Sequence, residues 1–97
     1  MNKYTELSDF EINELVSFNL GYVHTKSFDP CNNPAHAMQI IKDNLISITH
    51  DGIAWDVSCV KYPELSVWSG LENYNDNFYR KAMELFLLMK DADNEKV

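Results

Sequence analysis

The segment from Leu45 to Ser58 constrains the fold most strongly, because apolar and polar residues alternate on both sides of Asp51-Gly52. Alternation with a period of two is typical of a strand with one buried face. Asp-Gly also supplies the two positive-φ residues of a type I′ turn. A two-residue loop there places two apolar pairs on one face of a β-hairpin, Ile48 with Trp55 and Ile46 with Val57.

Capping signals predict a first helix that begins at Asp9. Ser8 and Glu11 match a capping box, and Gly21 is a typical C-terminal stop, so we expect the helix to end near Leu20. The residues that follow, 22–26, suit either a short strand or an extended connection. The buried face of the helix is expected to carry the apolar residues at helical spacing: Ile12, Leu15, Val16 and Leu20.

Two further helices are predicted from the residues that would begin them. Asn33 and Pro34 suit the N-cap and N1 positions of a helix that runs to about Asp43. Asn75-Asp76 suits the cap of a final helix that runs to about Lys90.

These elements predict a small single α+β domain with a helix-loop-helix, a β-hairpin and a C-terminal helix packed on the sheet. Leu65 to Trp68 is a candidate for a third antiparallel strand. The compact domain is expected over residues 1–90, followed by a polar frayed tail at 91–97. Within residues 82–89 Glu84 is the one polar residue. That composition is typical of a central core helix or of a helix partly buried in a homo-oligomer contact.

Composition and charge exclude several classes of function. The chain has 97 residues, of which 45% are hydrophobic, and a net charge of -7, which disfavours nucleic-acid binding through a basic patch. Acids interrupt the first 20 residues, so no secretion signal is expected. The longest apolar run, Leu85 to Met89, is far shorter than the roughly 20 residues of a membrane span. We therefore expect a soluble, cytoplasmic protein in which Cys31 and Cys59 are reduced thiols.

The loop from Phe28 to Pro34 is the first candidate site. Its two prolines stiffen the backbone around an acid, a thiol and two amides. Asn33 and Pro34 are explained in part by the start of a helix. The side chains that remain as candidates for binding a ligand or partner are Asp29, Cys31 and Asn32, with Asn33 beside them.

Aromatic and basic residues supply further candidates. Trp55 or Trp68 could stack on a nucleobase. Tyr62, Trp68 and Tyr74 lie in connections, where aromatics either anchor binding surfaces or seal a small core. Arg80 and Lys81 begin the last helix, where the dipole disfavours cations. They either mark an anion site or pair with nearby acids such as Asp76 and Glu84.

No catalytic or metal motif is present, so we expect neither an enzyme nor a cofactor. The histidine and cysteine spacing matches no closed zinc site. Cys31 with His24 or His36 could form a nucleophile and base, but no oxyanion device accompanies them. Packing of Cys31 as a small apolar group is the simpler interpretation.

Several short blocks together resemble the NinX-like proteins of lambdoid phages. The resemblance covers most of the chain, and its blocks are Leu7 to Asn13, Pro30 to Pro34, Ile40-Ile41, Ile46 to Ile48, Trp55 and Arg80 to Met83. It implies an accessory protein made in the host cytoplasm during infection, and no functional residues carry over from it.

Two functions are compatible with these features. The first is a non-catalytic phage protein that binds a host protein, with counter-defence as its role. The alternative is an oligomeric sponge for a small nucleotide-like signal. In the sponge, the loop around Asp29, Asn32 and Asn33 would supply hydrogen bonds, a tryptophan would stack, and Arg80 or Lys81 would meet phosphate.

Overall fold

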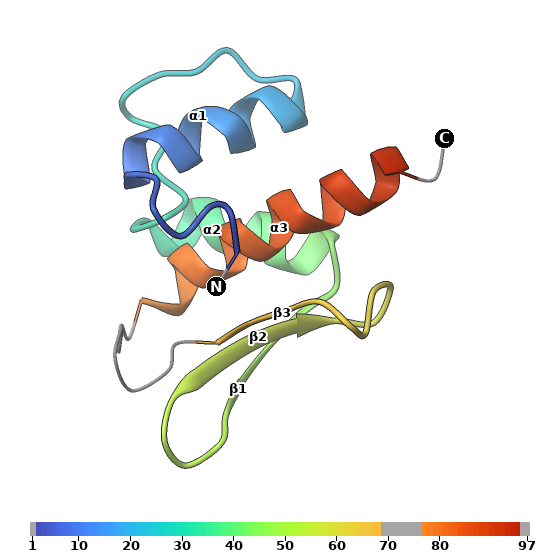
Figure 1. Cartoon of the computed structure of the whole chain (residues 1–97). Helices are drawn as coiled ribbons and strands as arrows, with labels where there is room; N and C mark the ends of the chain where they lie inside the picture. Colours follow the sequence, from blue (N-terminus) through green and yellow to red (C-terminus); the bar gives the residue numbers. More distant parts are fainter. Residues whose placement is uncertain (1, 69–76, 96–97) are drawn as a thin grey trace.

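The structure is a computed structural model that describes residues 2–68 and 77–95. Its elements in chain order are α1 (Asp9–Leu20), α2 (Pro34–Asp43), β1 (Ile46–His50), β2 (Trp55–Cys59), β3 (Ser66–Trp68) and α3 (Phe78–Glu95). The strands form an antiparallel sheet in the order β1-β2-β3, and α3 packs on this sheet (Figure 1). The predicted single α+β domain and its third strand are confirmed.

Helix α3 is the centre of the domain. It contacts every other helix and strand, and Figure 1 shows it between α1 and the sheet. Four of its apolar side chains have no exposed surface: Ala82, Met83, Leu85 and Phe86. The apolar stretch predicted from the sequence is therefore a core element within one chain.

The predicted ends of α1 and α2 are confirmed by their caps. Ser8 Oγ accepts a hydrogen bond from Glu11 N at 3.1 Å, and Glu11 Oε1 accepts one from Ser8 N at 3.0 Å. These bonds lower the pKa of Glu11. Gly21 follows α1 with φ 76°, in the left-handed region that glycine adopts without strain. Asn33 begins α2, because its Oδ1 accepts a hydrogen bond from Ala35 N at 2.9 Å.

The hairpin is present, but its predicted register was wrong by two residues. The loop contains the four residues 51–54 rather than two, because Asp51 Oδ1 accepts hydrogen bonds from Ile53 N at 2.8 Å and Ala54 N at 2.9 Å. A shift of two keeps every side chain on its predicted face. The apolar face toward α3 is therefore as expected, with the pairs Ile46 with Cys59, Ile48 with Val57 and His50 with Trp55.

The predicted end of the last helix was also wrong, since α3 continues through Glu95 instead of ending near Lys90. Its last turns are held by contacts with other elements. Asp91 Oδ2 accepts a hydrogen bond from Tyr4 OH at 2.6 Å. Asp93 Oδ1 accepts one from Lys61 Nζ at 2.7 Å. Residues 91–95 are therefore helical and attached rather than a frayed tail.

The side chain of Asn77, the residue before α3, caps the start of this helix. Asn75-Asp76 lies outside the described residues. Asn77 Oδ1 accepts a hydrogen bond from Arg80 N at 3.2 Å, as an N-cap side chain does. Residues 22–26 form a connection without strand structure. In the described ranges, no helix combines the length and the apolar character that crossing a membrane requires.

Candidate functional site

The predicted loop is bound to α1 by a residue that sequence reasoning missed. Asn13 lies in α1 with 5% of its surface exposed. Its Oδ1 accepts a hydrogen bond from Cys31 N at 3.2 Å, and its Nδ2 donates to Asp29 Oδ1 at 2.7 Å. A polar residue beside the buried positions Ile12 and Val16 was the available signal, because a buried amide needs partners.

The same loop is bound to α3. Asn77 Nδ2 donates to Cys31 O at 2.8 Å and to Asn32 Oδ1 at 3.0 Å. Asn32 Nδ2 in turn donates to Asp9 Oδ2 at 3.0 Å. The polar groups that the sequence proposed for a ligand therefore bind one another and the ends of two helices.

Arg80 completes this cluster from α3. Its Nη1 donates to Asp9 Oδ1 at 2.6 Å and its Nε to Glu84 Oε2 at 2.9 Å. Its Nη2 donates to two backbone carbonyls, Tyr4 O at 3.0 Å and Leu7 O at 2.7 Å. Although burial lowers it, the bonds to Glu84 and Asp9 hold the pKa of Arg80 above its ordinary value. We name this cluster the Arg80 junction: Asp9, Asn13, Asp29, Asn32, Asn77, Arg80 and Glu84.

The expected pairing of Arg80 with Glu84 is therefore found, and Asp9 is a second partner. Glu84 is engaged on both oxygens, since its Oε1 accepts hydrogen bonds from Asn2 Nδ2 at 3.1 Å and Thr5 Oγ1 at 3.4 Å. The junction thus attaches the N-terminal segment to α3.

Cys31 is a packed core group in this structure. It has no exposed surface, and its thiol donates to Asp9 O at 3.8 Å. Burial, followed by the charge of Asp9, raises the pKa of Cys31 to about 12, so the thiol is protonated at neutral pH. His36 Nδ1 accepts a hydrogen bond from Asp29 N at 3.0 Å, and His24 Nδ1 lies 3.5 Å from Ser17 Oγ. Neither contact activates the thiol.

The described residues contain no group of three His, Cys, Asp or Glu side chains that could hold a metal ion. Both cysteines are free thiols and both are buried. Cys59 Sγ donates to Tyr62 O at 3.6 Å, within the β2–β3 connection.

The remaining predicted residues lie apart from the loop. Lys81 and Trp55 do meet, but the ammonium of Lys81 donates to the backbone carbonyl of Trp55 at 2.8 Å. The Trp55 ring packs against Phe78, with centroids 4.9 Å apart. Trp68 lies in β3 opposite Asp56, and Tyr74 falls outside the described residues. Tyr62 is buried, and its hydroxyl donates to Asp93.

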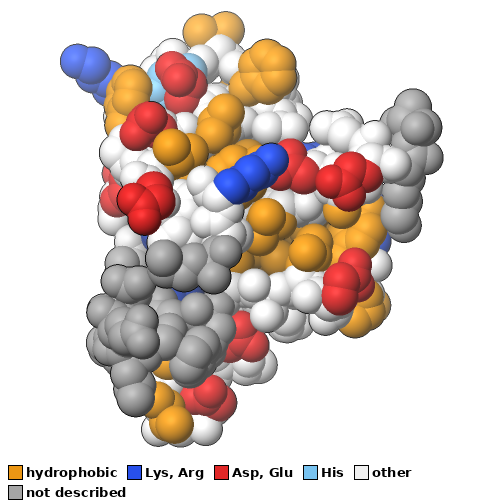
Figure 2. All heavy atoms as spheres, in the orientation of Figure 1, with side chains coloured by type: hydrophobic (Ala, Val, Ile, Leu, Met, Phe, Trp, Pro, Cys, Tyr) orange, Lys and Arg blue, Asp and Glu red, His pale blue; other side chains and the backbone are white. Residues whose placement is uncertain are grey.

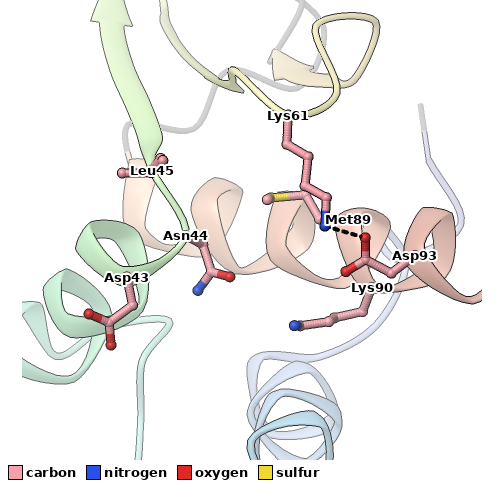
Figure 3. Close-up of a pocket in the computed structure, with 7 residues that line it drawn as sticks. All are labelled: Asp43, Asn44, Leu45, Lys61, Met89, Lys90 and Asp93. Carbon is pink, nitrogen blue, oxygen red and sulfur yellow. Dashed lines mark hydrogen bonds and ion pairs between the residues drawn. The ribbon is translucent and has the colours of Figure 1, made fainter.

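A hollow of about 220 Å³ opens near Tyr62, between the end of α2, the β2–β3 connection and α3 (Figure 3). Lys61 reaches across it to Asp93, and their atoms Nζ and Oδ1 are 2.7 Å apart. The sequence predicted no binding role for any of its lining residues, which are Asp43, Asn44, Leu45, Lys61, Met89, Lys90 and Asp93.

The charges of this hollow compensate one another. Lys61 and Lys90 face Asp43 and Asp93, and the Lys90 ammonium lies 5.3 Å from the centre of the Phe86 ring. Gln39 Nε2 already donates to both Asp43 oxygens. An electrically balanced hollow selects neither an anion nor a cation, so it defines no ligand class.

A different surface stands out on α1. Four large apolar side chains are exposed there and in the connection after it: Phe10 at 51%, Phe18 at 81%, Tyr22 at 56% and Val23 at 87%. Figure 2 shows hydrophobic side chains gathered over α1 and this connection, with carboxylates among them. We name this set, together with Glu11 and Glu14, the α1 outer surface. The sequence signal for it was available, because Phe10 and Phe18 fall off the predicted buried face of the helix.

The fold and these surfaces define a small α+β domain in which one side of α1 joins a polar junction and the other side is an exposed, partly apolar surface. Comparisons with protein-family models, with curated proteins and with solved structures found no match. The resemblance to NinX-like proteins stays a prediction.

Proposed function

We propose that this protein is a non-catalytic binding protein that engages a partner protein through the α1 outer surface. One observation supports this above all others. Four of the eight large apolar side chains that are exposed among the described residues lie on one helix and its following connection, while Asn13 and Arg80 are buried and bonded to other protein groups.

Catalysis has no geometric support among the described residues. The Cys31 thiol is buried and protonated. The Arg80 guanidinium is bound by two carboxylates and two carbonyls. A group that must attack or stabilise a substrate has to be reachable and must keep an unused bonding position. Neither of these groups meets that condition.

The outward apolar residues fit the anatomy of a protein contact. Aromatic side chains dominate the energetics of protein interfaces, and contiguous exposed apolar patches on small domains mark such sites. Phe18 is 81% exposed on a helix whose opposite face is already in the core through Ile12 and Val16. It therefore contributes little to folding and is available to a partner.

The resemblance to phage proteins suggests where the partner is found. We propose a host protein, and blunting of an antiphage defence as the role. The nucleotide sponge stays a prediction without a supporting contact, because Arg80 and the amides of the Phe28 to Pro34 loop bind protein groups instead. An oligomer through α3 likewise lacks support, since the apolar stretch of α3 is buried in one chain.

A comparative capture experiment tests the proposed function. Immobilised wild-type protein and the double variant Phe18→Ser with Val23→Ser are exposed to the same bacterial lysate, and retained proteins are quantified by mass spectrometry. We expect one or more partners to be retained about tenfold less by the double variant, because an interface anchor is lost.

The matched control is Ile53→Ser with Val60→Ser, two residues that are 60% and 75% exposed outside α1. This control should retain the partner like the wild type. Equal retention by all three proteins, or no enrichment over an unrelated acidic protein of similar size, contradicts the proposal.

A further inference from the structure

The α1 outer surface also indicates what kind of partner it fits, and this inference rests on the proposed function. We infer that the partner presents a cationic amphipathic segment, in which lysine or arginine side chains meet Glu11 and Glu14 while an apolar side chain packs on Phe18.

The charge of this surface has one sign. From Asp9 to Thr25 the chain carries three acids and no lysine or arginine. Asp9 is paired with Arg80, which leaves Glu11 and Glu14 exposed on the helix. Among the described residues no ion pair engages either of these two carboxylates. A partner that approaches the helix therefore meets uncompensated negative charge.

Spacing places this charge among the apolar groups. Phe10, Glu14 and Phe18 follow one another at intervals of four residues, so they are neighbours along one face of α1. The carboxylate of Glu14 thus lies between two exposed aromatic side chains. An apolar partner without cations would leave this carboxylate desolvated and unpaired, which is costly. A cationic partner satisfies it and can also place a cation over an aromatic ring.

Glu11 remains ionised in the folded protein. The hydrogen bonds from Ser8 lower its pKa, so its carboxylate stays ionised to a lower pH than that of an ordinary glutamate. It is also part of the capping box, and replacing it would disturb the helix start. Glu14 has no such role and is the better position for a charge test.

The overall charge favours the same class of partner. The net charge of -7 repels anionic membranes and nucleic acids and accelerates encounter with cationic proteins. Apolar contact and charge then have separable effects. Losing the aromatic anchor weakens the complex at every ionic strength, whereas losing an acidic side chain also removes long-range attraction to the cationic partner, an effect that is largest at low salt.

Fluorescence polarisation with a designed probe tests the inference. The probe is a labelled peptide of about 15 residues, with leucines at helical spacing and lysine and arginine elsewhere. Two further peptides serve as comparisons, one with glutamate in place of the bases and one with the same composition in scrambled order.

The protein variants separate the two contributions. Phe18→Ser should weaken binding of the cationic peptide about tenfold. Glu14→Lys should weaken it about tenfold at about 50 mM salt, and the difference should shrink at about 500 mM salt. The matched controls Val60→Ser and Glu64→Lys, both exposed outside α1, should change the affinity by less than about twofold.

Three results would overturn the inference. The first is equal weakening by Glu64→Lys, which would mean diffuse attraction to an acidic protein. The second is equal binding of the scrambled peptide, and the third is tighter binding of the acidic peptide. If capture from lysate still depends on Phe18 and Val23 while the cationic peptide fails, the proposed function stands and only the partner chemistry is wrong.

Discussion

The Arg80 junction and the α1 outer surface lie on opposite sides of the same helix, and each reverses the usual expectation. The junction is built from charged and amide groups, yet they are bonded to one another, and three of the seven, Asn13, Arg80 and Glu84, are buried. The outer surface is built from aromatic and aliphatic groups, yet they face solvent. Residue type alone therefore misidentifies the surface that is available to a partner.

Satisfaction of bonding groups explains the difference. Amide, carboxylate and guanidinium groups can find hydrogen-bond partners for their donors and acceptors within the fold. A cluster of such groups holds loops in place. Exposed apolar side chains cannot be satisfied by water. The four predictions below run from the largest expected effect on folding to the smallest. Three of them test one side of this comparison, and the prediction for Asp93 and Asp56 applies the same reasoning to two carboxylates outside it.

Arg80→Met should have the largest effect, a loss of about 3–5 kcal/mol in the free energy of unfolding. The substitution leaves Glu84 buried without its cation and two backbone carbonyls without a donor. Urea denaturation followed by circular dichroism measures the loss. Adding Glu84→Leu should recover part of it, because the uncompensated buried charge is removed. A loss below about 1 kcal/mol for Arg80→Met would show that the junction is not structural.

Asn13→Ala should cost about 1–3 kcal/mol, since Cys31 N and Asp29 Oδ1 each lose a buried hydrogen-bond partner. The same denaturation assay applies. Asn19→Ala is a matched control on the exposed side of α1 and should change stability by less than about 0.5 kcal/mol. Equal losses for the two variants would contradict a special role for Asn13.

Asp93 and Asp56 should change the stability of the protein in opposite directions as the pH rises. Hydrogen bonds from Lys61 and then Tyr62 lower the pKa of Asp93 below 3.8. Its contribution is therefore present above the unfolded pKa and lost as pH falls through the folded value. Burial raises the pKa of Asp56 above 3.8, so ionised Asp56 disfavours folding as pH rises through that value.

Asp93→Asn should accordingly destabilise the protein at neutral pH and flatten its acid sensitivity. Asp56→Asn should stabilise it at neutral pH, because Asp56 Oδ1 is buried without a hydrogen-bond partner. Denaturation midpoints between about pH 3 and about pH 7 measure both slopes. A destabilised Asp56→Asn variant at neutral pH would mean that this carboxylate makes a favourable contact there.

Phe18→Ser should have the smallest effect on folding, a shift of the melting temperature by less than about 3 °C. The side chain is 81% exposed, so little burial is lost. Thermal denaturation by circular dichroism measures the shift. A drop of more than about 5 °C would mean that Phe18 stabilises the fold, as the Arg80 junction does, and would contradict its role as a binding anchor.

Local signals in the sequence predicted much of the fold. Ser8, Glu11 and Gly21 act through contacts within a few residues, so the ends of α1 could be read directly. The hairpin register could not, because Asp-Gly suits more than one turn and the Asp51 side chain selects the longer loop. The extension of α3 to Glu95 depends on Tyr4 and Lys61, which are distant in sequence.

The candidate site was harder to predict for the same reason. The loop residues Asp29, Cys31 and Asn32 were predicted as candidates for binding a ligand or partner, but their partners within the fold, Asn13 and Asn77, come from other parts of the chain. Without those partners, a structural junction and a binding site have the same composition. Phe18 could be recognised in the sequence as an apolar residue off the buried face of α1. In this molecule that signal indicates the exposed surface better than the polarity of the loop residues does.

The attachment of the N-terminal segment to α3 sets an order of assembly. Arg80 bonds to Asp9 across 71 positions, Asn2 to Glu84 across 82, and Tyr4 to Asp91 across 87. Contacts of such long separation close a large loop, which makes them slow to form, and they require that α3 has been made. During synthesis, α1 therefore leaves the ribosome long before the helix that fixes it exists. The residues of this segment are made long before α3 and are among the last to reach their final place.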